Sequence, residues 1–230
     1  MSFHDYRADA QRVYATLAEG GVGIVPTDVG YVILGVSGAA IWKIFEVKRR
    51  LPDKLNAMCG CLEMHRDLHV LDDNRRAVVS AIVGDADLPM GTVAPGRLDH
   101  PALASLETDV LDQTTDEGTI AMLLNAGKLL DELARIAFAD DRLVIGSSAN
   151  ISLQGVKFRA EDIEPEIRAA ADIVIDYGLA RWNRYGKSST MIDVGRMRVV
   201  RYGSCFDLID DLLRRRFGIA LPPDPERPLE

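Results

Sequence analysis

Short apolar runs alternate with amphipathic stretches along most of the chain, and this pattern predicts an α/β fold. Compact apolar runs indicate buried strands, whereas apolar residues three and four positions apart indicate helices. We expect strands at 22–25, 31–36, 56–62, 119–124, 143–146, 173–175, 190–194 and 199–202, and helices at 5–19, 39–50, 72–83, 129–138, 161–170 and 207–216. Because the alternation is irregular and short strands adjoin near the end, a mixed sheet with flanking helices is favoured over a regular doubly wound one.

Two regions interrupt this pattern. Residues 84–118 are rich in Pro, Gly and Asp, which predicts loops around one or two short strands. Near the C-terminus, the run from Leu221 to Pro225 contains three prolines and cannot continue a helix. The sequence therefore predicts a single α/β domain over residues 1–217, followed by an extended proline-rich tail over residues 218–230.

The composition is that of a folded protein, with 47% hydrophobic and 27% charged residues. The 27 basic and 35 acidic residues give a net charge of -8, which argues against broad, sequence-independent binding of nucleic acid. A local basic pocket for a small anion remains compatible with this charge. The N-terminus does not resemble a signal peptide, and the sequence contains no apolar run long enough to cross a bilayer, so we expect a cytoplasmic protein with no membrane partner.

Three cysteines, Cys59, Cys61 and Cys205, cannot form an even disulfide framework. Cys59 and Cys61 precede His65 and His69, so a metal cluster is one interpretation of this segment. The spacing lacks the usual C-x2-C geometry of zinc sites, and core thiols with surface histidines are favoured instead. We therefore predict no resident metal site.

Polar and basic residues follow several of the apolar segments. The first strand ends in Pro26-Thr27-Asp28, a helix ends in Lys48-Arg49-Arg50, and a later strand ends in Ser147-Ser148-Ala149-Asn150. Fixed cations, hydroxyls and an amide on short loops are the donors that phosphate oxygens require. Cations in the last turn of a helix also interact favourably with the helix dipole. Lys48 and Arg50 could therefore either bind phosphate or simply be the solvated end of a helix. The serines and the asparagine of the 147–150 motif favour phosphate binding.

Two further turns repeat the pattern. Lys187-Ser188-Ser189-Thr190 precedes a strand, and Arg201-Tyr202-Gly203-Ser204 closes the next one. No P-loop or G-x-G-x-x-G motif is present, so a phosphate site would have to be assembled from these separate turns. Asp28 could either act in chemistry or only order its turn.

In this order, the motifs resemble those of the YrdC/Sua5 family, the L-threonylcarbamoyladenylate synthases. The family's P-T-[ED]-T-x-Y-G is similar to 26–32, its K-x-R-P with the following K-P-L step to 48–55, and its S-x-N with trailing small residues to 148–155. Its S-T-V-[IV]-D strand is similar to 189–193, and its closing R-x-G to 201–203. The resemblance covers about residues 8–204. It implies an open, twisted YrdC-like sheet around a positively lined cavity.

The resemblance also implies a reaction, in which ATP, bicarbonate and L-threonine give threonylcarbamoyl-AMP and pyrophosphate for tRNA threonylcarbamoyladenosine modification. ATP would be a substrate accompanied by Mg²⁺, and a tRNA or a tRNA-modifying transferase would be a possible partner. The implied catalytic and phosphate-binding residues are Lys48 and Arg50. The other implied site residues are Ser148, Asn150 and Arg201 for the nucleotide, and Thr27, Tyr31, Lys54, Thr119 and Ser189 for the other substrates.

The chain departs from the family pattern at four places, one of which is a distorted echo of the family's P-G-P-x-T at Pro89-Met90-Gly91-Thr92. Val29 and Val32 replace a threonine and a glycine, and Leu123-Leu124-Asn125 stands where the family has R-x-P. Losing one charge-assisted contact of that kind removes about 1.5–3 kcal/mol of binding free energy. A catalytically impaired nucleotide- or RNA-binding module is therefore the alternative hypothesis. A structural or partner-binding domain is a third one.

Overall fold

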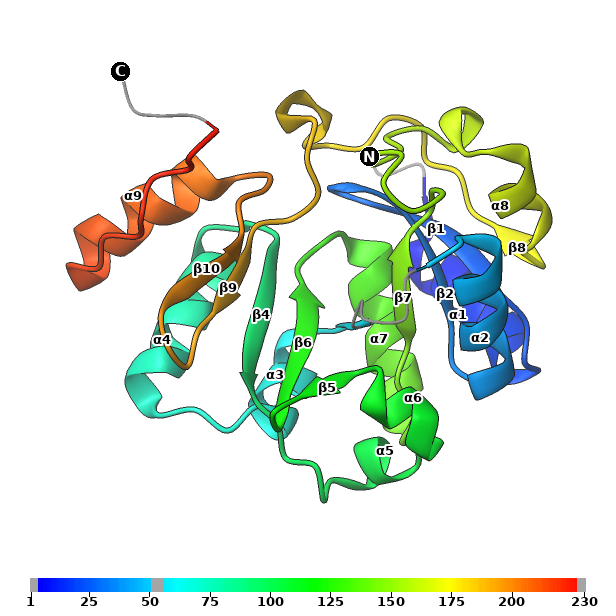
Figure 1. Cartoon of the computed structure of the whole chain (residues 1–230), viewed down its shortest axis with the longest axis horizontal. Coiled ribbons are helices and arrows are strands. Elements are labelled where there is room, and N and C mark those ends of the chain that lie inside the picture. The colour runs from blue at the N-terminus through cyan, green and yellow to red at the C-terminus, as the bar shows by residue number, and fades with distance from the viewer. Residues whose placement is uncertain (1–3, 51–55, 227–230) are drawn as a thin grey trace.

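A strongly twisted mixed sheet organises the molecule, shown in Figure 1 as a computed structural model that describes residues 4–50 and 56–226. Its strand order is β10-β9-β4-β6-β3-β7-β2-β1-β8, and β5 pairs with β6 beside this path. The pairs β1–β8, β3–β6 and β4–β9 are parallel, and the others are antiparallel. The strands are β1 Gly23–Thr27, β2 Gly30–Gly35, β3 Ala57–Cys59, β4 Met90–Pro95, β5 Thr115–Asp116, β6 Thr119–Leu124, β7 Ile145–Ser148, β8 Ile173–Val174, β9 Met191–Asp193 and β10 Arg198–Arg201.

Helices flank the sheet, and α1 packs against α7. The α-helices are α1 Tyr6–Ala18, α2 Gly38–Val47, α3 Leu62–Leu68, α4 Asp73–Ser80, α5 Pro101–Ala104, α6 Thr108–Asp112, α7 Lys128–Ala139, α8 Pro165–Ala169 and α9 Phe206–Phe217. A π-helical turn, Ala81–Asp85, extends α4, and 3-10 turns span Ala160–Asp162 and Asn183–Tyr185. In the described part of the chain, no helix is both long and apolar enough to span a bilayer.

Three clusters of buried apolar side chains connect these elements. The largest joins β3, β4 and β6 to α3, α4 and α9, with Met58 and Leu68 among its fully buried members. A second joins α1 and α7 to the sheet through residues such as Val13 and Leu133. A third lies between the β1–β2 hairpin and α2 and includes Ile44. Burial of this apolar surface fixes the backbone from which the polar turns project.

The expected α/β class, mixed sheet and flanking helices are confirmed, and most predicted elements lie within a few residues of their observed bounds. The strand expected at 56–62 is wrong beyond Cys59, because residues 62–68 form α3 and bury Met64 and Leu68 one turn apart. The helix expected at 161–170 is interrupted before Pro165, whose fixed φ suits the start of α8. Strands β4 and β5 were expected within 84–118, but the short helices α5 and α6 were not.

The segment after α9 lies against the domain. Leu221 is buried in the largest apolar cluster, and its backbone N–H donates to Asp210 Oδ1 at 3.0 Å. Further along, Asp224 and Glu226 form ion pairs with Lys187 at 3.2 and 2.7 Å. The described part of the predicted tail, residues 218–226, therefore contains no helix or strand but is held by specific contacts.

Candidate functional site

The turn between β1 and β2 is ordered by Thr27. Its buried hydroxyl donates to the carbonyl of Gly30 at 2.5 Å and accepts from the N–H of Val29 at 3.2 Å. Gly30 has a φ of 126°, and a Cβ there would also collide with Val156. The hydroxyl of Thr27 thus closes the hairpin, as in other side-chain-stabilised turns.

Tyr31 connects β2 to the loop after β8. Its hydroxyl lies 2.6 Å from Asp176 Oδ1 and 2.8 Å from the carbonyl of Gly178. Burial, together with the hydrogen bond and negative charge of Asp176, raises the pKa of this phenol. The backbone carbonyl of Tyr31 accepts from the N–H of Ala149 at 2.8 Å, so β2 also holds the chain that follows β7.

Lys48 joins the end of α2 to the loop after β7. Helix α2 begins behind the N-cap Ser37 and ends at Val47, so Lys48 is its C-cap residue. The Lys48 side chain is only 1% exposed, and its ammonium donates to the carbonyls of Ser148 and Asn150. The carbonyl of Lys48 in turn accepts from the N–H of Ser152 at 2.9 Å. The two motifs from distant parts of the sequence are therefore in direct contact.

One acceptor in this loop, the side-chain oxygen of Asn150, has no donor among the described residues. Asn150 Nδ2 donates to the carbonyl of Ile151 at 2.6 Å, which fixes the orientation of its amide. Its Oδ1 is buried and has no hydrogen-bond partner in the described ranges. Because buried polar atoms are normally hydrogen-bonded, this position of Asn150 is suited to a bound ligand or water.

Arg50 approaches the same loop from the other side. Its Nη1 donates to Ser147 Oγ at 2.9 Å, and its guanidinium lies over the ring of Phe45 at 5.2 Å. Desolvation in this half-buried position lowers the pKa of Arg50. Arg49, by contrast, points to solvent and pairs with Glu166 at 3.1 Å.

Arg201 and Ser189 form a second polar group, at the other end of the sheet order. Arg201 Nε donates to the carbonyl of Ser189 at 3.0 Å, and Nη2 donates to Ser189 Oγ at 3.1 Å. Desolvation by the surrounding protein lowers the pKa of Arg201, although part of its side chain is exposed. In Figure 1 the ends of β1, β7 and β10 lie along the upper side of the twisted sheet.

Thr119 and Lys54 are the remaining residues that the family resemblance implied for substrate binding. Thr119 begins β6, pairs with Pro95, and donates its hydroxyl to the carbonyl of Asp116 at 2.7 Å. It lies at the opposite end of β6 from Leu124, after which the chain turns into α7. Lys54 lies outside the described residues.

A hollow of about 360 Å³ lies beside the β1–β2 turn and contains charged residues that the motif analysis did not identify. Arg181 Nη1 lies 3.4 Å from Asp28 Oδ2 and 3.0 Å from Asp87 Oδ2. Asn125 Nδ2 donates to Asp87 Oδ1 at 3.0 Å, and Lys128 also lines the hollow. Burial raises the pKa of Asp28, while Arg181 opposes that shift. Only Asp28 belonged to a recognised motif, and no sequence signal indicated its partners.

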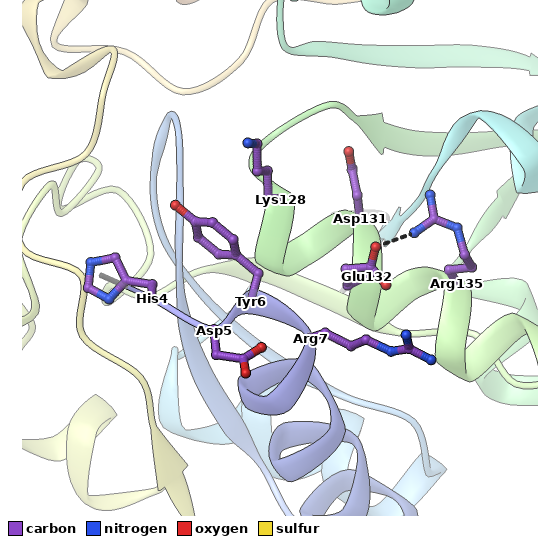
Figure 2. A pocket seen from close by; sticks show the side chains of 8 residues that line it. All are labelled: His4, Asp5, Tyr6, Arg7, Lys128, Asp131, Glu132 and Arg135. Carbon is purple, nitrogen blue, oxygen red and sulfur yellow. Dashed lines mark hydrogen bonds and ion pairs between the residues drawn. The ribbon is translucent and has the colours of Figure 1, made fainter. Parts of the chain in front are cut away.

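A second, shallower hollow of about 620 Å³ runs between the start of α1 and the first turns of α7 (Figure 2). Tyr6 and Lys128 border both hollows, and Lys128 Nζ lies 5.8 Å from the centre of the Tyr6 ring. Figure 2 shows Asp131 and Arg135 projecting from α7 on the same side of the hollow. Burial raises the pKa of Asp131 to about 7, and its Oδ1 is buried with no hydrogen-bond partner in the described ranges.

The cysteine–histidine segment from Cys59 to His69 is part of the protein core. Cys59 and Cys61 are buried free thiols, which confirms their interpretation as core residues. His65 and His69 are also buried, at 1% and 0% exposure, so their expected position at the surface is wrong. Within residues 4–50 and 56–226, no group of three or more His, Cys, Asp or Glu side chains could hold a metal ion.

The chain is similar to known proteins in sequence and in fold. Residues 15–203 match the Sua5/YciO/YrdC family, whose description is "telomere recombination". A hypothetical protein from Streptococcus mutans is 24% identical with a TM-score of 0.75, and the match covers 92% of this chain and 93% of that one. P. abyssi Sua5 in complex with L-threonine is 19% identical with a TM-score of 0.71, and the match covers 93% of this chain and 59% of that one. Full-length HypF in a phosphate- and nucleotide-bound form is 14% identical with a TM-score of 0.61, and the match covers 85% of this chain and 29% of that one. No curated protein matches the chain.

The solved structures and the family match support different conclusions. At such identities the solved structures establish the fold, and the chain spans only 59% of the Sua5 structure and 29% of HypF. The family match spans residues 15–203 and includes the β1–β2 turn, the end of α2, the loop after β7 and the Arg201 turn. On the basis of this match, the chain belongs to the Sua5/YciO/YrdC family.

Proposed function

We propose that this protein is a nucleotidyltransferase that makes a carbamoyl-adenylate from ATP, bicarbonate and an amino acid, with L-threonine as the expected amine, for tRNA threonylcarbamoyladenosine modification. The observation that carries the proposal is the contact between the Lys48–Arg50 motif and the loop after β7. It places a half-buried guanidinium on the loop that also carries Asn150, whose Oδ1 has no hydrogen-bond partner among the described residues. The Sua5 structure with L-threonine and the HypF structure with nucleotide are consistent with ligands of these kinds.

The side chains at this site would have different roles in binding the substrates. Arg50 would donate to phosphate oxygens through its planar fork, because its Nη1 already lies at the loop after β7, where it donates to Ser147 Oγ. Lys48 would act mainly as a positioning residue, because its ammonium holds the carbonyls of Ser148 and Asn150. Arg201 and Ser189 would offer further donors to the nucleotide or the amine substrate.

In chemical terms, the amine forms a carbamate with bicarbonate, and a carbamate oxygen then attacks the α-phosphorus of ATP and displaces pyrophosphate. Two anions must approach each other, so the main task of the protein is to position them and to neutralise their charge. Mg²⁺ suits a triphosphate because it binds phosphate oxygens together with one or two carboxylates and several waters. Asp28 and Asp87, which both pair with Arg181 beside the β1–β2 turn, are carboxylates that could contribute to such a site when ATP is bound.

A second candidate is a nucleotide- or RNA-binding module without catalysis. One observation favours it: at the turn after β6, Asn125 binds Asp87 and supplies no cation to the site. Under this alternative, ATP binds with an affinity that depends on Arg50, but no amino acid causes pyrophosphate release.

The decisive experiment measures pyrophosphate release from ATP in the presence of bicarbonate and L-threonine, with ATP binding measured separately by titration calorimetry. We expect Arg50→Ala to weaken ATP binding about ten- to hundred-fold, the effect of one charge-assisted contact. Arg49→Ala is the matched control, because it removes the neighbouring arginine from an exposed ion pair with Glu166. Equal affinities in the two variants would refute the phosphate role of Arg50. ATP binding without pyrophosphate release for any amino acid would refute the enzyme and leave the module.

A further inference from the structure

The described tail, which follows α9, returns to the turn after β10. Leu221 is buried in the largest apolar cluster, and its N–H donates to Asp210 Oδ1 on α9. One residue further, the carbonyl of Pro222 accepts from the hydroxyl of Tyr202 at 3.3 Å. Figure 1 shows this segment, drawn in red, running back beside α9. The tail is therefore anchored next to Arg201, one of the residues proposed to offer donors to the substrates.

Two acidic side chains of the tail converge on one cation. Lys187 Nζ lies 3.2 Å from Asp224 Oδ2 and 2.7 Å from Glu226 Oε2. The Asp224 side chain is only 10% exposed, and its other oxygen, Oδ1, accepts from the N–H of Glu226 at 3.0 Å. A carboxylate that is so deeply buried requires a paired cation, and Lys187 supplies it. The hydrogen bond to Glu226 is the main reason why the pKa of Lys187 lies above its ordinary value.

Lys187 belongs to the same polar group as Ser189 and Arg201. It directly precedes Ser188, whose hydroxyl lies 3.5 Å from Arg201 Nη2. The carbonyl of Lys187 accepts from the hydroxyl of Ser204 at 2.6 Å, and the carbonyl of Ser188 accepts from the N–H of Ser204 at 2.7 Å. These contacts fix the backbone of Lys187 beside the turn after β10. An ammonium in this position is a point charge of the kind that binds phosphate oxygens.

The tail occupies the donors that an anionic ligand of this ammonium would use. Carboxylate and phosphate oxygens compete for the same N–H groups, and an ammonium has only three of them. The Glu226 side chain is 75% exposed, so its ion pair with Lys187 is screened by solvent and exchanges readily. A polyphosphate carries more negative charge than either carboxylate and can replace both of them.

We propose that Lys187 is a phosphate-binding residue and that Asp224 and Glu226 are internal competitors for it, so that the tail restrains nucleotide binding until a polyphosphate displaces them. The inference rests on the proposed function for the nature of the ligand, and adds to it a cation and a restraint. No covalent bond changes in this exchange, because the ammonium keeps its protons and only changes its acceptors. Since Leu221 is buried, the residues after Pro222 are those that would move.

Titration calorimetry of the full chain with ATP and with inorganic tripolyphosphate tests the proposal. Asp224→Asn combined with Glu226→Gln removes both negative charges and retains the shape of each side chain. We expect this tail variant to bind both ligands about fivefold to tenfold more tightly than wild type, because two ion pairs no longer have to be broken. Glu226→Gln alone changes an exposed side chain, so folding is preserved, and it should tighten binding about twofold to threefold.

The role of Lys187 is tested in the background of the tail variant. There, Lys187→Met should weaken both ligands about ten- to hundred-fold, because no tail contact offsets the lost phosphate contact. In the wild-type background the same substitution should have a smaller effect, since it also removes the cation for which the tail competes. Such non-additivity is the signature of two groups that share one partner.

A matched control changes the net charge by the same amount at a different place. Asp85→Asn combined with Asp211→Asn also removes two carboxylates, from ion pairs with Arg216 and Arg215 in the last turn of α9, at 2.7 and 2.8 Å. We expect ATP affinity in this control to stay within about twofold of wild type, because exposed charges at a distance are screened by salt.

The outcomes separate this inference from the proposed function. If ATP binding depends on Arg50 but the tail variant and Glu226→Gln bind as the control does, the inference is overturned and the nucleotide site remains. Unchanged affinity on adding Lys187→Met to the tail variant would also overturn it. If the tail variant binds ATP more tightly but releases no pyrophosphate with any amino acid, the inference holds and the proposed reaction fails. If neither wild type nor the tail variant binds ATP or tripolyphosphate, both are overturned.

Discussion

The buried histidine pair on α3 should make the stability of this protein strongly dependent on pH. His65 and His69 are one helical turn apart, and their Nδ1 atoms lie 2.8 Å from each other. His69 Nε2 lies 3.3 Å from the carbonyl of Ile120, which can only accept. If Nε2 of His69 carries its proton, Nδ1 of His69 must accept from Nδ1 of His65. The Nε2 of His65 is then an unprotonated, buried acceptor, and it has no partner among the described residues.

Burial lowers the pKa of His65 from its usual 6.5 to about 4, and burial together with the neighbouring His65 lowers that of His69 to about 3. In the unfolded chain both imidazoles would titrate near their usual value and bind protons that the folded state does not bind. Stability from the pair is therefore present above the unfolded pKa and lost as pH falls toward the folded pKa. Between about pH 7.5 and about pH 4.5 each imidazole should remove about 2.5 kcal/mol from the free energy of unfolding.

The test compares urea unfolding of wild type with that of a His65→Leu, His69→Gln double variant over this pH range. The glutamine retains a donor for the carbonyl of Ile120, and the leucine fills the apolar surroundings of the buried ring. Carboxylates that titrate in both proteins cancel in the difference. We expect the stability difference to change by about 5 kcal/mol over the range if both effects add. Parallel curves for the two proteins, or an NMR titration of either imidazole near its ordinary pKa, would refute the reasoning.

Three further predictions concern single contacts. Tyr31→Phe should lower the free energy of unfolding by about 1–2 kcal/mol in urea titrations, because it removes the phenol that Asp176 accepts from. Gly203→Ala should lower it by about 1–3 kcal/mol, since a Cβ would collide with the backbone carbonyl of Ser188; an unchanged midpoint would contradict that close packing. Burial raises the pKa of Asp131 from 3.8 to about 7, so the carboxyl group destabilises the folded state increasingly as pH rises through this range. Asp131→Asn should therefore raise the free energy of unfolding by up to about 4 kcal/mol near pH 8 but change it little near pH 4.

The sequence predicted those parts of the fold in which local pattern and tertiary packing agree. Helices α1, α7 and α9 have clear apolar periodicity, and the interior strands are compact apolar runs. The pattern failed where elements are very short, because α5 and α6 have only four and five residues. Helix α3 did have a signal, because Met64 and His65 lie one turn before Leu68. Two histidines in that segment, however, favoured an exposed interpretation.

The candidate site was predicted to different degrees. The contact of Lys48 with Ser148 and Asn150 could be expected, since motifs at the ends of buried elements tend to converge at one side of a sheet. The ion pairs of Arg181 with Asp28 and Asp87 could not be expected from the sequence. Asp87 and Arg181 lie in irregular segments 94 residues apart and belong to no motif. Only the tertiary structure brings those two loops together at the β1 turn.

The different burial of Lys48 and Arg50 leads to a final prediction that separates positioning from binding. Lys48→Met keeps most of the side-chain volume but removes the donors to the carbonyls of Ser148 and Asn150. It should lower the free energy of unfolding by about 1.5–3 kcal/mol and also weaken ATP binding, because the loop that carries Asn150 loses its support. Arg50→Ala should weaken ATP binding with a smaller change in stability, since Arg50 is only half-buried. Urea unfolding and calorimetry on the same samples give both quantities. If Lys48→Met weakens ATP binding without any loss of stability, Lys48 itself contacts the phosphates and its carbonyl bonds are secondary.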